Sequence, residues 1–322
     1  MNRSLSVTAK ISILVVLALV FGAVMIGLSI RHGESRGLDQ NMFGTKGDQN
    51  IDKTFTVQPD GDLVIDADEG EVSVLGTDSN QVSVQVIMTG DQERIDKYHV
   101  DFKQEGNTVR IEGRENRRHF RMFDDRSLRV RFEVKVPKKF NLDLQTSGGD
   151  LVIKTLNGHV VGTTSGGNLE LTDIDGKVKL ETSGGDIDVL NMNGDVVLTT
   201  SGGNIVAESV TGDFEVGTSG GNIRMKKIDA KLRAETSGGN IEVAMATNKG
   251  ISLETSGGNV IVKLPRSIAG EIDASATGGD VDCDLQYSGK IKDGDMHGTI
   301  NGGGNLIKAS TSGGNISFVG LD

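Results

Sequence analysis

Apolar residues in the second half of the chain recur at a spacing of two, within a longer repeat that has an 18-residue period. The tetrapeptide TSGG marks each repeat, with its threonine at Thr146, Thr164, Thr182, Thr200, Thr218 and Thr236. With Thr146 as position 1, positions 6, 8, 11 and 15 are apolar in these units, position 17 is mostly apolar, and polar residues stand between. This alternation is typical of strands with one buried face, whereas a helix requires spacings of three and four. We therefore expect an all-β fold, a single-stranded β-solenoid with 18-residue coils and two short strands in each coil.

Two sets of glycines predict the corners of each coil. A glycine pair at positions 3 and 4 forms one corner, where residues without Cβ adopt positive φ without strain. A single glycine at position 13 forms the other corner, at Gly158, Gly176, Gly194 and Gly212. Position 5 carries only amides and carboxylates: Asp150, Asn168, Asp186, Asn204, Asn222 and Asn240. Coils should stack at about 4.8 Å, the distance between paired strands. We expect the residues of position 5 and the threonines of position 1 to form columns hydrogen-bonded along the stack.

The apolar slots also predict individual core residues. Position 11, for example, reads Leu156, Ile174, Met192, Val210, Ile228 and Ala246. The strict repeat covers residues 146–264, although the TSGG at Thr255 comes one residue later than the period requires. Related motifs begin at Ala276, Asn301 and Thr311, and the spacing between the last two is too short for a whole coil. We predict irregular coils and a C-terminal cap over 265–322, and divergent coils forming an N-terminal cap over 51–145.

A charge-free apolar stretch over 11–30 precedes the β region. Twenty helical residues span about 30 Å, the thickness of a bilayer core. We predict a cytoplasmic tail over 1–10, with Arg3 and Lys10, a transmembrane anchor over 11–30 and a polar linker over 31–50. The protein would be a single-pass protein of the cell (inner) membrane with an extracytoplasmic, periplasmic β domain. The alternative is a cleaved signal peptide, but the stretch is long for one and no A-x-A site ends it.

The charge and the cysteine content limit the partners. The net charge of −11 argues against nucleic acid. The chain has one cysteine, Cys283, in an apolar slot, which we interpret as a small core residue. No intrachain disulfide is possible, and a cross-link between two chains is the alternative.

One segment is strongly basic. Seven arginines gather between residues 114 and 131, interleaved with His119, Phe120 and Phe123: Arg114, Arg117, Arg118, Arg121, Arg126, Arg129 and Arg131. They are the candidate contact with an anionic surface, meaning phospholipid head groups, lipopolysaccharide or an acidic polymer. The alternative is a solvated hairpin whose arginines prevent aggregation at a sheet edge.

The chain shows no pattern of catalytic residues. Its five histidines are scattered without an H-E-x-x-H pair. The TSGG serine does not stand in G-x-S-x-G, and no glycine cluster precedes Lys-Ser or Lys-Thr. Calcium-binding β-rolls use G-G-x-G-x-D-x-U-x, but here the third glycine is missing and four of the six position-5 residues are asparagine. We expect no enzymatic activity, no cofactor and no metal.

The passage V-x-V-P-K-x-F-x-L-x-L-x-T-S-G-G-D from Val134 to Asp150, followed by T-S-G-G-[ND]-[IL]-x-[VL] units, carries a resemblance. Over about residues 51–322 the chain resembles the bacterial "putative adhesin" family of β-strand-repeat proteins, also grouped as toastrack domains. The resemblance implies a β-solenoid of the cell envelope that acts in adhesion or in envelope-stress signalling. Two functions follow. One is a binding or structural module that contacts an envelope polymer, an anionic surface or a partner protein; the alternative is a sensor subunit that acts through a membrane partner, because the tail has only ten residues.

Overall fold

The computed structural model describes residues 46–116 and 127–322, which belong to a unit from Gly44 to Asp322. The predicted tail, the anchor and residues 31–45 of the predicted linker lie outside the described residues. Lys46–Asn50 were expected to end that linker, but they begin strand β1 (Lys46–Thr56), which corrects the boundary. Across 46–116 and 127–322 there is no helix with the length and apolar character that a membrane crossing requires. The helix described is α2 (Gln92–Lys97), with Asp91 as its N-cap.

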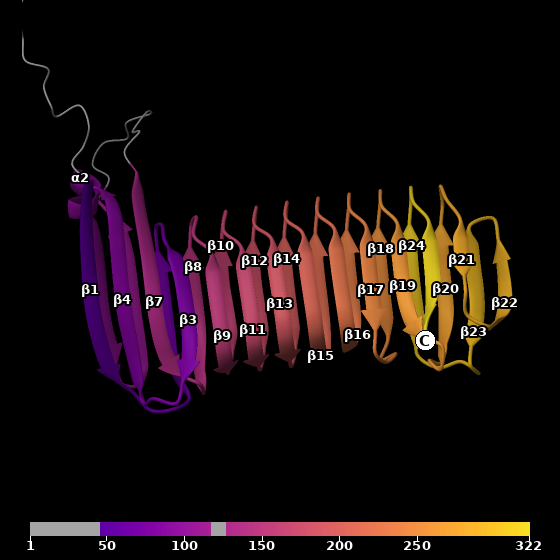
Figure 1. The fold of residues 1–322 in the computed structure, drawn as a ribbon, viewed down its shortest axis with the longest axis horizontal. Coiled ribbons are helices and arrows are strands. Elements are labelled where there is room, and N and C mark those ends of the chain that lie inside the picture. Colours follow the sequence, from indigo (N-terminus) through magenta and orange to yellow (C-terminus); the bar gives the residue numbers. More distant parts are fainter. Residues whose placement is uncertain (1–45, 117–126) are drawn as a thin grey trace, which may run out of the picture. The chain divides into compact units, whose positions relative to one another are not determined.

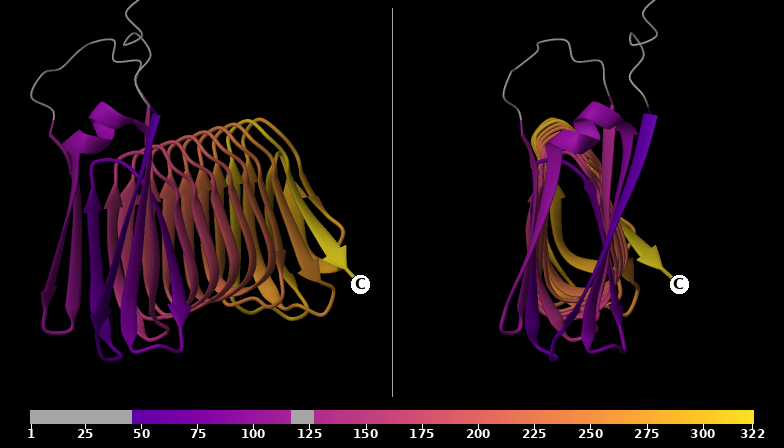
Figure 2. Two further views of the ribbon diagram at one scale, coloured as in Figure 1. Left: turned by 60° about the vertical axis from the view of Figure 1, so that its left-hand side comes forward. Right: turned by 90° about the vertical axis from the view of Figure 1, so that its left-hand side faces the viewer.

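The strands wrap into a flattened coil with two faces (Figures 1 and 2). Apolar side chains fill the space between these faces. Each regular coil gives one strand to each face, and equivalent residues of successive coils pair in parallel. Val160 pairs with Val178, and Leu169 pairs with Ile187, one full period further along the chain in both cases. The all-β coil and its 18-residue period are therefore confirmed.

In the regular repeats, face A contains the strands that follow the TSGG corner. Its order in space, from one end of the stack to the other, is β1, β4 (Gln81–Asp91), β7 (Leu128–Pro137), β3 (Glu71–Thr77), β9 (Leu151–Asn157), β11 (Leu169–Asp175), β13 (Ile187–Asn193), the first parts of β15 (Ile205–Thr218) and β16 (Ile223–Thr236), β17 (Ile241–Met245), β19 (Val260–Pro265), β25 (Ile316–Leu321) and β21 (Val281–Cys283).

Face B contains the strands that lead into that corner. Its order is β5 (Tyr98–Glu105), β6 (Thr108–Glu115), β2 (Gly61–Ala67), β8 (Phe140–Thr146), β10 (Val160–Thr164), β12 (Val178–Thr182), β14 (Val196–Thr200), the second parts of β15 and β16, β18 (Ile251–Thr255), β24 (Leu306–Thr311), β20 (Gly270–Ala276), β23 (Asp295–Ile300) and β22 (Tyr287–Lys292).

The predicted apolar slots form the core, with one exception. Positions 6, 8 and 15 are buried throughout the strict repeats, as are the predicted position-11 residues from Leu156 to Ile228. Ala246 is exposed instead, because this coil lacks the extra position-10 residue with positive φ, such as Lys227 in the preceding coil, and its register shifts by one residue. Met245 occupies the slot and pairs with Ile228.

The two glycine corners differ in backbone conformation. The glycines of position 13 adopt positive φ, for example 133° at Gly194, except for Gly158. A Cβ on Gly194 would also lie 2.1 Å from the carbonyl oxygen of Gly176 in the preceding coil. The TSGG glycines do not adopt positive φ, so positive φ was the wrong reason for them. A Cβ on the second glycine would meet the preceding coil, as at Gly203, where it would lie 2.0 Å from the carbonyl oxygen of Gly185. The second glycine of the pair is therefore needed for close backbone approach between coils.

The polar columns exist, but the threonines bond differently from the expectation. At position 5, the Asn204 N–H donates to Asp186 Oδ1 at 2.6 Å, and Asn222 Nδ2 donates to Asn204 Oδ1 at 3.3 Å. The position-1 threonines are buried, and their hydroxyls do not bond to one another. Thr200 Oγ1 instead donates to the carbonyl of Gly185 at 2.8 Å, and this contact recurs along the stack.

Residues 46–146 extend the coil at one end, but their order in space differs from their order in the chain. The coil of β2 and β3 packs directly on β8 and β9, while β6 and β7 lie further out. Strands β1, β4 and β5 then close the stack in antiparallel pairs. Across this end, Phe55 stacks on Phe102 and Gln104 Nε2 donates to the carbonyl of Thr56 at 2.8 Å.

The other end also departs from chain order. Thr311 pairs with Thr255 on one side and with Ala276 on the other, so the last coil of the chain is inserted between two earlier ones. As expected from their spacing, the motifs at Asn301 and Thr311 do not enclose a whole coil, because Asn301 begins a turn between β23 and β24. Arg266, which follows β19, forms ion pairs with Asp284 after β21 at 3.0 Å and with Asp322 after β25 at 3.2 Å. These ion pairs link the inserted coil to the two coils beside it.

Candidate binding surfaces

The described arginines of the basic segment are partly engaged within the fold. Arg114, at the end of β6, pairs with Asp66 and Asp68, and the hydrogen bond from Arg114 holds the pKa of the Asp66 carboxyl below its usual range. Arg131 pairs with Glu71 at 3.2 Å and with Glu133 at 3.7 Å. These two arginines therefore have a structural role on the flanks of the segment.

The remaining arginines differ. Arg129, on β7, is exposed, and within the described chain it forms no ion pair. Arg117, Arg118, Arg121 and Arg126 lie outside the described residues. Whether the seven arginines act together as an anionic-surface contact remains a prediction.

The two ends of this segment meet α2 at one corner of the unit. The Asp91 N–H donates to the carbonyl of Ser127 at 2.9 Å, and the Asn116 N–H donates to that of Lys97 at 2.9 Å. Lys46, where the described chain begins, is the strand-pairing partner of the same Asp91 in the antiparallel ladder of β1 and β4. The chain thus enters the β unit at the corner where the basic segment leaves and returns.

Partly buried polar contacts connect the elements of that corner. Arg94 of α2 bridges Glu69 at 2.8 Å and Glu115 at 3.0 Å, and its side chain is 17% exposed. The Tyr98 hydroxyl donates to the carbonyl of Glu69 at 2.9 Å, and burial raises the pKa of Tyr98 above its ordinary value. Such a network fixes the flanks of the segment relative to the strands.

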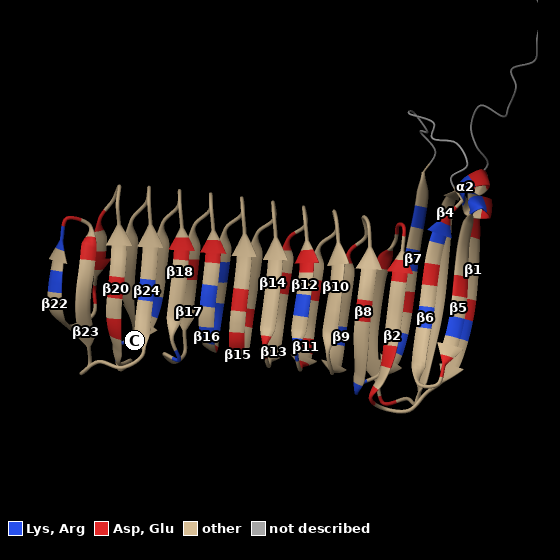
Figure 3. Cartoon of the chain, turned by 180° about the vertical axis from the view of Figure 1, so that it is seen from behind, with Lys and Arg blue, Asp and Glu red and all other residues tan. Residues whose placement is uncertain are grey.

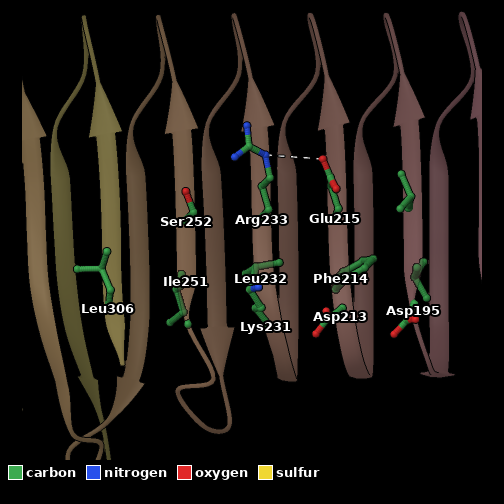
Figure 4. Close-up of a pocket in the computed structure, with 13 residues that line it drawn as sticks. Asp195, Asp213, Phe214, Glu215, Lys231, Leu232, Arg233, Ile251, Ser252 and Leu306 are labelled. Carbon is green, nitrogen blue, oxygen red and sulfur yellow. Dashed lines mark ion pairs between the residues drawn. The ribbon is translucent and has the colours of Figure 1, made fainter. Parts of the chain in front are cut away.

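Face B carries two hollows that the sequence reasoning missed. The first, called the apolar trough, has a volume of about 600 Å³ and crosses β14, β15, β16, β18 and β24 (Figure 4). Its outward-facing apolar side chains are Val197 and Leu306. Charged side chains stand around it: Asp195, Asp213, Glu215, Lys231 and Arg233. Gly250 has no side chain, whereas Lys231 stands at the equivalent position on the paired strand, so Gly250 leaves open space in the trough.

The second hollow, called the hydroxyl groove, lies beside the trough toward the TSGG corner. It has a volume of about 400 Å³ and is lined by hydroxyls, two carboxylates and a glycine: Thr199, Thr200, Gly217, Thr218, Ser219, Glu235, Thr236, Ser237, Glu254 and Ser256. A signal existed in the sequence, because Gly217 at position 18 replaces the Thr or Glu of neighbouring coils. Among so many glycines, that one was indistinguishable from turn punctuation.

Other reactive groups do not assemble into a site in the described parts of the chain. Within 46–116 and 127–322, no three His, Cys, Asp or Glu side chains are placed to hold a metal ion together. His297 pairs with Asp273 at 3.0 Å on face B. Cys283 is a free, half-buried thiol that packs against the core, which agrees with its interpretation as a small core residue.

A stacked β-coil with a continuous apolar interior and polar outer faces defines a strand-repeat domain of the toastrack type. The chain belongs to the Toastrack DUF4097 family, whose model matches residues 61–318. No curated protein matches the chain.

Several solved structures are similar to the chain. A "putative adhesin" from Bacteroides fragilis NCTC 9343 is 13% identical, with 84% of this chain and 97% of that chain covered and a TM-score of 0.37. A "putative adhesin" from Parabacteroides merdae ATCC 43184 is 14% identical, with coverage of 84% and 96% and a TM-score of 0.34. A "putative lipid binding protein" from Parabacteroides distasonis ATCC 8503 is 13% identical, with coverage of 84% and 96% and a TM-score of 0.27.

Proposed function

We propose that the protein is a membrane-anchored, extracytoplasmic β-solenoid that acts as a non-catalytic, adhesin-like binding module of the cell envelope. One observation carries this proposal: Lys46, Asn116 and Ser127 meet around α2 at a single corner. An anchor over 11–30 would tether this corner to the bilayer. The same tether would bring the basic segment to the lipid head groups.

The charges of this segment support an anionic surface as its partner. Each lysine or arginine close to an anionic membrane contributes about 1 kcal/mol of binding. Arg129 is exposed for such a contact, whereas the ion pairs of Arg114 and Arg131 hold the flanking strands in place. In this proposal the arginines hold the α2 corner against the anionic membrane. The outer faces of the remaining coils stay accessible for binding other ligands.

The alternative is a sensor subunit of an envelope-stress pathway. It differs in one requirement, a membrane partner protein that contacts residues 11–30, because the expected cytoplasmic tail has only ten residues. Purification of the full-length chain in mild detergent distinguishes the two. A stoichiometric membrane protein that co-purifies, and is lost when residues 11–30 are replaced by an unrelated span, supports the sensor.

Topology tests the anchoring directly. In spheroplasts, added protease should remove the β unit, and mass spectrometry should find the native N-terminus still attached to the membrane-bound fragment. A mature N-terminus near residue 30 would show that the apolar stretch is a cleaved signal peptide. A β unit that stays protected until the membrane is lysed would contradict an extracytoplasmic location.

A further inference from the structure

Gly217 stands in a strand for no reason of backbone conformation. Its φ is outside the left-handed region, and a Cβ built on it would meet only Thr199 Cγ2, at an ordinary 3.8 Å. Its strand-pairing partners in the two neighbouring coils are Thr199 and Glu235, so this position accepts residues with side chains. Glycine inside a strand weakens it, and often marks a place where a ligand approaches closely. The missing side chain leaves open space in the hydroxyl groove.

The lining of this groove offers hydrogen bonds at regular intervals. Ser219, Ser237 and Ser256 come from successive coils, so they recur along the stack at about 4.8 Å. Glu235 and Glu254 add carboxylate acceptors, and Arg233 pairs with Glu235. A pyranose ring is about as long as one coil spacing, and its hydroxyls both donate and accept. A linear sugar polymer lying along the stack can therefore bond to each coil in the same way.

The surroundings of the groove select among polymers. Five carboxylates stand around the trough and the groove, at Asp195, Asp213, Glu215, Glu235 and Glu254, against the two cations Lys231 and Arg233. This excess of negative charge repels acidic polymers. The trough next to the groove has outward-facing apolar side chains, which suit the C–H face of a sugar ring. Figure 3 shows acidic and basic residues of face B along the whole stack.

We propose that the hydroxyl groove, together with the edge of the apolar trough, binds a linear, uncharged polysaccharide that runs along the stack across β14, β15, β16 and β18. This inference rests on the proposed function as a binding module and names its ligand class. The sugar site lies on face B of the regular repeats, whereas the proposed anionic contact is at the α2 corner.

The test uses the full-length chain in detergent on an array of neutral linear hexose and N-acetylhexosamine oligosaccharides, with polyglutamate and polylysine beside them. The wild-type chain should bind at least one neutral oligosaccharide. Gly217→Gln fills the groove and should weaken this binding about tenfold or more, a loss of about 1.4 kcal/mol. Thr163→Gln is the matched control, because it changes the same position on β10, outside the groove, and should leave the affinity unchanged. Both variants should melt no lower than the wild type, since polar side chains fit this position in neighbouring coils.

Three results would overturn the inference. They are no binding to any neutral oligosaccharide, equal binding by the Gly217→Gln variant, and preferential binding of polylysine, which would make the groove a site for basic peptides. None of these results concerns the anchor or the basic segment. The topology experiment tests the anchor and vesicle flotation tests the basic segment, so the failure of one proposal is distinguishable from the failure of the other.

Discussion

At the scale of single residues, the TSGG corner is fixed by contacts between coils. The threonine donates its hydroxyl to a glycine carbonyl of the preceding coil, and the second glycine lets that backbone approach. The first glycine has no such neighbour, since a Cβ on Gly202 would come no closer than 3.8 Å to another coil. Two adjacent glycines in one motif thus have different physical roles.

This difference predicts the outcome of two adjacent substitutions. Gly203→Ala places a Cβ 2.0 Å from the Gly185 carbonyl oxygen and should lower the free energy of unfolding by about 3 kcal/mol, because packed backbones cannot give way. Gly202→Ala is the matched control and should be neutral or slightly stabilising. Urea unfolding of both variants checks this. Equal midpoints would contradict the assignment of close approach to the second glycine.

Asp188 predicts a pH effect. Asp188 is exposed, but partial desolvation raises the pKa of its carboxyl, and the carboxylates of Asp186 and Glu170 raise it further. A raised pKa means that ionising Asp188 costs stability in the folded protein, so the penalty is present at neutral pH and absent below the unfolded pKa of about 4. Asp188→Asn should therefore stabilise the protein at pH 7 by about 0.3 kcal/mol, a small effect because the side chain is largely exposed. Melting curves at pH 7 and pH 3 test this, and a gain of equal size at both would refute the explanation.

At the scale of elements, the coil is the unit that the sequence determines best. Slots such as Leu169, Ile187 and Ile205 stack in register because a shift by one residue would turn every apolar side chain outward. The same requirement explains why Met245 fills the core slot in the coil that begins at Thr236, where the register is shifted by one residue. Each coil buries its apolar face only against its neighbours, so the stack should tolerate the loss of one whole unit.

Deletion of one coil tests this directly. Without residues 182–199, the coil at Thr164 meets the coil at Thr200 with every slot preserved, so the protein should stay folded and β-rich. Deletion of 182–190 removes half a coil and places polar positions inside, so that variant should lose its cooperative melting transition. Circular dichroism and thermal melting report on both. The 18-residue period would be contradicted if the two deletions behaved alike.

Pairing partners at the ends could not be predicted. The TSGG at Thr311 has the same local sequence as the regular motifs, and nothing near it states that it stacks on Thr255, which lies several strands earlier in the chain. The choice depends on long-range contacts such as those of Arg266 with Asp284 and Asp322. The candidate sites show the same limit. The basic segment was visible as composition, whereas the engagement of Arg114 by Asp66 appears only when strands distant in sequence lie side by side. The glycine at Gly217 could be read from the repeat, but the groove that it opens is visible only once the coils are stacked.

At the scale of the whole molecule, the two ends of the β unit differ. The corner at α2 receives the chain at Lys46 and both ends of the basic segment, while β22 and β23 lie at the opposite end of the stack (Figure 1). The charge of −11 is unfavourable for binding to an anionic membrane as a whole. Membrane contact through the basic segment must therefore be local and sensitive to salt.

Vesicle flotation of a fragment from residue 37, which lacks the expected anchor, measures this central claim. The fragment should float with anionic vesicles and not with neutral ones, and binding should fall steeply as salt rises through the screening range. Substitution of Arg117, Arg118 and Arg121 by serine should abolish flotation with little change in melting temperature. Substitution of Lys290, Lys292 and Lys308 by serine removes the same charge at the other end and should leave flotation intact. Equal loss in both triple variants, or no preference of the wild-type fragment for anionic vesicles at low salt, would contradict a membrane contact through the basic segment.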